Sequence, residues 1–290
     1  MELDESIRQR LMTFQRIEIT EHHIYRRLAR VIRPAENQQV LEQIAQDELR
    51  HSQGWERYTG QEARPDQLKI WFYYWVSRIL GFTFGVKLME RGEEAAQQNY
   101  GQITAVIPEA AAFLHEEEIH EAKLLAMLDE EHLRYAGSVV LGLNDALVEL
   151  TGALAGLTLA LQNTALIALA GLITGIAASL SMAASEYLAT RSEETEKHPF
   201  RAAIYTGIAY IVTVVLLILP YLLLENYYIC LAITLSTAVL IIALFNYYIS
   251  VAKDESFRAR FLEMAGLSLG VAGLSFVIGY LIRTFLGIEV

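Results

Sequence analysis

Glu48-Leu49-Arg50-His51 and Glu117-Glu118-Ile119-His120 are two copies of one short pattern, Glu-x-x-His, in the first half of a 290-residue chain. Residues three apart share one face of a helix, so each copy places a carboxylate beside an imidazole. One copy arises easily by chance on a surface helix. Two copies predict a helical bundle in which these side chains meet at a common axis.

A single glutamate precedes each copy in an equivalent place. Glu18 lies seven residues before Tyr25, and Glu93 lies seven residues before Tyr100. Four helices that face one axis would then gather four carboxylates and two imidazoles. So many like charges cannot be buried together without cations, and two divalent metal ions would supply them. The predicted ligands are Glu18, Glu48, His51, Glu93, Glu117 and His120.

The ligand types favour iron or manganese, with zinc as a less suitable substitute. Glu21 and Glu90 lie on the same helix faces as the predicted ligands, and Glu121 follows His120, so these three are additional candidate ligands. A solvated or outer position is the alternative for Glu21. The alternative for the whole pattern is a charged bundle with solvated glutamates and no metal.

Residues 10–135 resemble the ferritin-like, rubrerythrin-type family, which takes one Glu from each of two helices and Glu-x-x-His from the other two. The resemblance implies a four-helix bundle with a di-iron centre, and ferroxidase activity is a candidate. We expect helices at 5–33 and 36–58, a third that ends before Pro108, and a fourth at about 109–134. The aromatic segment 61–82 is either a crossover or an extension of the third helix, and its aromatics face core, membrane interface or a partner subunit.

The two halves of the chain differ in charge and hydropathy. Residues 1–137 contain 16 Lys and Arg against 23 Asp and Glu, whereas residues 138–290 contain 7 and 11. The second half holds five apolar segments, each long enough to cross a bilayer of about 30 Å. They lie at roughly 138–160, 164–189, 201–223, 227–251 and 262–286. We therefore expect an all-α protein with a soluble domain at 1–135 and a five-span membrane domain at 136–290.

Basic residues between the spans predict the orientation. The loops at 190–200 and 252–261, with Arg201, hold six Lys and Arg, while those near 161–163 and 224–226 hold none. The positive-inside rule places the basic loops, and the N-terminal domain, in the cytoplasm and the C-terminus outside. Only Arg283 argues against this. The first ten residues lack an apolar stretch, so we expect no cleaved signal peptide. A cell inner membrane is the expected location.

Ionisable side chains inside membrane spans indicate an ion or proton path, because burying charge there is costly. Asp145 and Glu149 are one turn apart on the first span, and Met182 and Glu186 are one turn apart on the second. A thioether beside carboxylates suits Fe²⁺. The alternatives are ordinary packing for Met182 and an interfacial position for the two first-span carboxylates.

The segments VVLGLNDALVELTGALAGLTLAL and GLITGIAASLSMAASEYLATRSE resemble the first two spans of the vacuolar iron transporter family. FLEMAGLSLGVAGLSFVIGYLIRTFLGI resembles its last span. The resemblance implies a dimeric antiporter of divalent metal and protons, with Asp145 and Met182 in the transport path. Two positions depart from the family: Ala146 stands where it has Gly, and Ser185 where it has the Gly of Gly-Glu-Tyr. The combination is similar to bacterial membrane-bound ferritins that export iron.

Pairs of glycines four residues apart, such as Gly152 and Gly156, let membrane helices approach closely. They indicate either packing within the chain or dimerisation, and we expect a homodimer that contacts through the first spans. A single cysteine, Cys230, excludes disulfide frameworks and thiolate metal sites. No basic patch points to nucleic acid.

These observations predict an exporter of Fe²⁺ or Mn²⁺, driven by protons, whose N-terminal domain captures or oxidises the metal. Two alternatives stay open. One is a membrane-anchored di-iron oxidase or peroxidase, and the other is a metal-sensing domain that gates the transporter.

Overall fold

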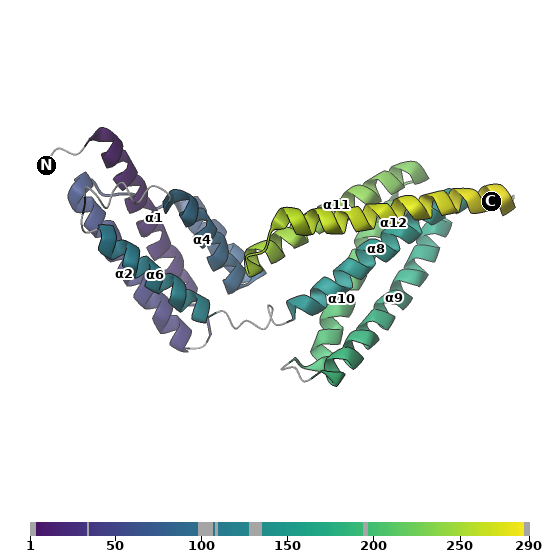
Figure 1. Cartoon of the computed structure of the whole chain (residues 1–290), viewed down its shortest axis with the longest axis horizontal. Coiled ribbons are helices and arrows are strands. Elements are labelled where there is room, and N and C mark those ends of the chain that lie inside the picture. Colours follow the sequence, from purple (N-terminus) through teal and green to yellow (C-terminus); the bar gives the residue numbers. More distant parts are fainter. Residues whose placement is uncertain are drawn as a thin grey trace. The chain divides into compact units, whose positions relative to one another are not determined.

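The computed structural model describes residues 4–33, 35–97, 107, 110–127, 135–193 and 197–286, without the side chains of 93–97, 125–126 and 286. These residues form ten α-helices and no strand, which confirms the all-α prediction. The chain divides into two compact units, Met1–Glu130 and Glu131–Val290 (Figure 1).

The N-terminal unit contains five described helices. They are α1 (Glu5–Ala29), α2 (Ala35–Thr59), α3 (Gln67–Leu80), α4 (Phe82–Gln97) and α6 (Ala110–Ala126). Asp4 and Asp66 begin α1 and α3 by accepting hydrogen bonds from backbone N–H groups of the first turn. Gly81 separates α3 from α4 with a φ of 101°, a conformation that favours glycine. The aromatic segment is therefore a short helix of its own.

Two apolar clusters hold this bundle together. One gathers Ile24, Tyr25, Leu28, Leu41 and Ile44 with side chains from α3, α4 and α6. The other gathers Leu11, Phe14, Trp55, Ile107 and Ala110. Glu18 on α1 lies between residues of the first and second cluster in sequence, and Glu48 on α2 does likewise. The carboxylates thus occupy the middle of the bundle, where apolar side chains on both sides limit access of water.

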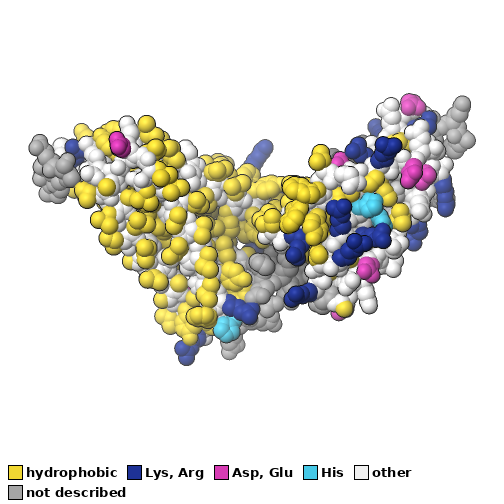
Figure 2. Space-filling model, turned by 180° about the vertical axis from the view of Figure 1, so that it is seen from behind, with side chains coloured by type: hydrophobic (Ala, Val, Ile, Leu, Met, Phe, Trp, Pro, Cys, Tyr) yellow, Lys and Arg dark blue, Asp and Glu magenta, His cyan; other side chains and the backbone are white. Residues whose placement is uncertain are grey.

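Five long apolar helices make up the C-terminal unit. They are α8 (Ala136–Leu161), α9 (Thr164–Ser192), α10 (Pro199–Leu223), α11 (Tyr227–Lys253) and α12 (Phe257–Leu286). Each is long and apolar enough to cross a membrane, as the sequence predicts. Helix α8 is central, since it contacts the other four. Hydrophobic side chains cover most of this unit's visible face, whereas the N-terminal unit displays many charges (Figure 2).

Glycines allow α8 to approach its neighbours closely. A Cβ atom on Gly142 would lie 2.4 Å from the carbonyl oxygen of Thr206 on α10, and one on Gly279 of α12 would lie 2.2 Å from that of Gly156. A Cβ on Gly152 would meet Val271 of α12 at 2.8 Å. Gly152 and Gly156 therefore pack against α12 within the chain, which is one of the two roles that their spacing indicates, and the homodimer stays a prediction.

Candidate metal centre

Three helices of the N-terminal unit bring acidic and imidazole side chains together at its centre. Glu18 comes from α1, Glu48 and His51 from α2, and Glu117 from α6. Each of these residues offers a ligand atom, and the four atoms all lie within 4.8 Å of one another. Glu18, Glu48 and His51 are buried, while Glu117 is partly exposed. The repeated Glu-x-x-His pattern thus places its side chains at one buried point.

The Nδ1 atoms of both histidines face the carboxylates. His51 Nδ1 lies 3.1 Å from a Glu117 oxygen and 3.5 Å from a Glu18 oxygen. His120 Nδ1 lies 3.1 Å from Glu48 Oε1 and 3.7 Å from Glu117 Oε2. The two rings are stacked, with centroids 5.9 Å apart. His51 thus belongs to the four-residue group, and His120 adjoins that group through Glu48 and Glu117.

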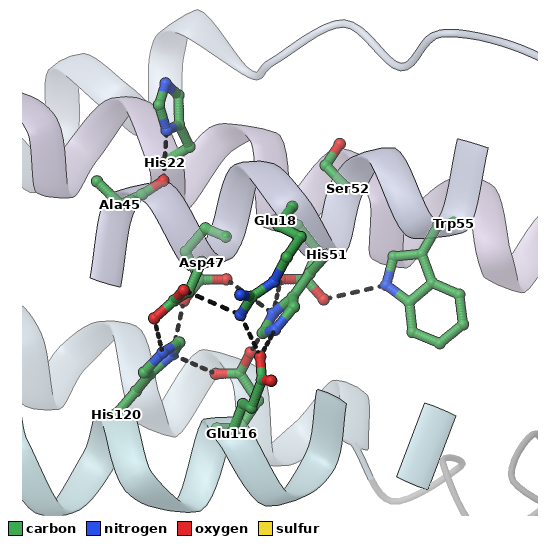
Figure 3. Close-up of polar contacts among 12 residues, drawn as sticks. Glu18, His22, Ala45, Asp47, His51, Ser52, Trp55, Glu116 and His120 are labelled. Carbon is green, nitrogen blue, oxygen red and sulfur yellow. Dashed lines mark hydrogen bonds and ion pairs between the residues drawn. The ribbon is translucent and has the colours of Figure 1, made fainter. Parts of the chain in front are cut away.

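Two carboxylates outside the predicted ligand set, Asp47 and Glu116, contact the opposite side of the rings (Figure 3). His51 Nε2 lies 2.7 Å from Glu116 Oε2, and His120 Nε2 lies 3.2 Å from Asp47 Oδ2. Arg50 forms ion pairs with both acids, at 2.5 Å and 2.9 Å. Partners of this kind fix the orientation of a metal-binding histidine and raise its basicity.

A sequence signal for these two residues exists. Asp47 immediately precedes Glu48, and Glu116 immediately precedes Glu117, so the repeated pattern is an acid followed by Glu-x-x-His. The contacts are exchanged, because the histidine of each motif meets the leading acid of the other. The five-residue pattern is therefore more specific than the four-residue one.

The charges of the cluster shift the pKa values of its members. Burial, together with the neighbouring Glu48, raises the pKa of the Glu18 carboxyl well above its usual value. Burial alone would also raise the pKa of Glu48, but the hydrogen bond with His120 and the ion pair with His51 lower it to about 2. For His120, burial lowers the pKa, but hydrogen bonds to Glu117 and Glu48 outweigh it and raise the pKa to about 10. The pKa of His51 is raised for the same reason.

The donor set fits a divalent metal ion. Glu48 Oε2 is buried and has no hydrogen-bond partner among the residues that the structure describes, although Oε1 of the same side chain contacts His120. A buried carboxylate oxygen without a partner is costly, and a cation would satisfy it. The indole N–H of Trp55 donates to Glu18 Oε1 at 3.2 Å and so orients that carboxylate. Oxygen and imidazole ligands suit iron, manganese or zinc.

The remaining predicted ligands lie in different surroundings. Glu93 is on α4, but its side chain and all of Tyr100 are outside the described residues. Glu21 is buried and lines a cavity of about 240 Å³ together with residues of α3 and α4. Glu90 is half-buried on α4, and Glu121 is exposed on α6. The structure therefore brings together five of the six principal candidates.

The candidate transport residues of the membrane unit lie on α8 and α9. Asp145 is half-buried, while Glu149 is exposed and accepts a hydrogen bond from Tyr210 of α10 at 3.1 Å. Glu186 accepts from Ser138 at 2.5 Å. Because Ser138 precedes Asp145 by seven residues, Glu186 lies roughly 10 Å along α8 from Asp145. Met182 is half-buried and packs against the apolar core of this unit.

Part of the membrane unit is similar to a known protein family. Residues 136–198 match the model of the VIT family, which places a VIT family domain over α8, α9 and the loop that follows. No curated protein matches the chain. The match falls on the two helices that carry Asp145, Glu149, Met182 and Glu186.

Proposed function

We propose that this protein moves divalent iron or manganese across a membrane, and that its N-terminal domain binds the same metal. The observation that carries the proposal is the presence, in one chain, of a VIT family domain and a buried carboxylate–imidazole cluster. VIT family domains imply transport of iron or manganese. A second metal-binding domain on such a chain serves capture or handling of the transported ion.

In this proposal the N-terminal domain is a ferritin-like di-metal centre. Glu18, Glu48, His51, Glu117 and His120 supply five of its ligands, and Glu93 supplies the sixth. The Nδ1 atoms of both histidines face the site, and the exchanged contacts with Asp47 and Glu116 hold the rings in that orientation. Iron held by such ligands can supply oxidation chemistry, so ferroxidase activity belongs to the proposal.

The transport path runs along α8 and α9. Asp145, Glu149 and Glu186 supply oxygen ligands and Met182 supplies a thioether sulfur. Protons compete with a divalent cation for the same carboxylates, so inward proton movement drives metal outward. Six basic residues in the two loops assigned to the cytoplasm support this direction. The domain that binds the metal then lies on the side from which the metal leaves.

Flux in proteoliposomes separates this proposal from its alternatives. We would load vesicles with a metal-sensitive dye and compare the full chain, a chain without residues 1–135, and the double variant Glu48→Ala with Glu117→Ala. Transport by all three, strongest for the full chain at low metal, supports capture. Flux in the full chain alone would favour a gating sensor. A full chain that oxidises Fe²⁺ without any flux would favour the membrane-anchored oxidase.

A further inference from the structure

Helix α3 presents an apolar face to the outside of the N-terminal unit. Leu68, Trp71, Phe72, Trp75 and Ile79 are exposed, with Leu68 at 81%, Trp71 at 61% and Ile79 at 73%. Their spacing of three and four residues makes one continuous stripe along the helix. The opposite face is buried through Ile70 and Ser77. A contiguous exposed patch of this kind marks a contact surface.

The charge of this segment is opposite to that of the domain around it. Between Asp66 and Glu90 the sequence has no acidic residue but contains Lys69, Arg78 and Lys87. Lys69 and Arg78 lie on α3 and are exposed. Residues 1–137 as a whole carry seven more acidic than basic residues, by subtraction of 16 from 23. Helix α3 therefore presents a basic and aromatic surface within an acidic domain.

We propose that α3 lies in the headgroup region of the bilayer that holds α8–α12, with its tryptophans at the level of the lipid carbonyls. Aromatic rings favour this region, and Lys and Arg beside them attract anionic lipid phosphates. In the sequence, residues 127–135 join α6 to α8, so the covalent link keeps the N-terminal domain within reach of the bilayer. The basic side chains Lys69 and Arg78 favour anionic lipid over an apolar protein surface as the partner of this face. The inference needs the membrane spans but not the proposed transport.

Tryptophan fluorescence of the full-length protein tests the proposal directly. The chain has three tryptophans, all in the N-terminal domain, and Trp55 is fully buried. Proteoliposomes would contain phosphatidylglycerol and phosphatidylcholine brominated either near the carbonyls or near the acyl-chain ends. We expect bromine near the carbonyls to quench most of the Trp71 and Trp75 emission. The variant Trp71→Phe with Trp75→Phe retains only Trp55, and its emission should not be quenched.

A second variant tests whether the positive charge of α3 contributes to its contact with lipid. Lys69→Glu with Arg78→Glu keeps both tryptophans but removes the attraction to anionic lipid, so quenching by brominated lipid should fall. Two outcomes would overturn the proposal. If acrylamide in the water quenches Trp71 and Trp75 while brominated lipid does not, the face is in solvent. If neither quencher acts on them, another protein surface, such as a second copy of this chain, covers the face.

Discussion

At the scale of single residues, the cluster depends on side chains that contribute unequally to it. Glu48 is 1% exposed and contacts both histidines, whereas Glu121 is exposed on the neighbouring α6. We expect Glu48→Ala to abolish stoichiometric binding of Mn²⁺ or Fe²⁺ by the N-terminal domain, because it removes the carboxylate shared by both motifs. Glu121→Ala is the matched control and should bind normally. Metal content after gel filtration measures both, and equal loss in the two variants would contradict the role of the cluster.

Asp47 and Glu116 contact the Nε2 atoms of His120 and His51, on the side of the rings that faces away from the predicted ligands. We expect Asp47→Asn and Glu116→Gln each to weaken metal affinity about 10–100-fold, the usual effect of losing a partner that orients a metal-binding histidine. The stoichiometry should stay unchanged, since no ligand is lost. Isothermal titration of the full chain with Mn²⁺ measures both quantities. A changed stoichiometry with unchanged affinity would show that these acids are ligands themselves.

The sequence predicted the gathering of Glu18, Glu48, His51, Glu117 and His120 better than it predicted the contacts of Asp47 and Glu116. Residues three apart on a helix share a face whatever surrounds them, so Glu48 and His51 could be paired without a structure. Asp47 points about 100° away from Glu48 around α2. Its contact with His120 depends on how α6 packs against α2, which helical periodicity does not determine. The sequence therefore shows that Asp47 and Glu116 precede two predicted ligands, but it does not show which histidine each acid contacts.

At the scale of helices, close packing around α8 rests on glycines. Gly142 leaves no room for a Cβ beside the backbone of α10, whereas Gly270 on α12 has no atom within 4 Å of that position among the described residues. We expect Gly142→Ala to destabilise the membrane unit by about 1–3 kcal/mol, the usual cost of overpacking. Gly270→Ala is the control and should be neutral. Thermal unfolding in detergent, followed by size exclusion, compares them, and equal midpoints would contradict the α8–α10 packing.

The presence of the membrane helices could be predicted from the sequence, but the packing of one helix against another could not. The five apolar segments form five helices, and their length and hydropathy were enough to predict them. For segment 61–82 the sequence did not distinguish a crossover from an extension of the third helix. In the structure Gly81, with its positive φ, ends α3 and makes it a separate helix. The glycine spacing on α8 was equally compatible with a contact inside the chain or between chains. The structure shows the contact inside the chain, because α12 lies beside Gly152 and Gly156.

At the scale of the whole molecule, metal capture and metal passage should be separable. Asp145→Ala removes a carboxylate from a membrane helix, so we expect flux in proteoliposomes to be lost while metal binding by the N-terminal domain is unchanged. Glu48→Ala with Glu117→Ala should do the reverse, with binding lost and flux measurable at high metal. Normal flux in Asp145→Ala would show that α8 does not line the path and would favour the anchored oxidase.

The basic loops predict an orientation of the whole chain in the membrane, and cysteine labelling can measure it. Cys230 is fully buried, so it should give little background. Glu225 and Ser256 are exposed, in the loops before α11 and before α12. In spheroplasts, an impermeant maleimide should label Glu225→Cys at once but Ser256→Cys only after permeabilisation. The opposite pattern would reverse the direction of the proposed transport.

The exchanged contacts between the two motifs are also informative about how the sequence could have arisen. His51 meets Glu116 while His120 meets Asp47, which is the reciprocal pattern of a twofold contact between identical partners. Such a pattern is expected if one hairpin gene was duplicated and fused after its product already paired with itself. Each half now supplies the partner for the other half's imidazole. Loss of the acid in one half would therefore leave the imidazole of the other half without its partner.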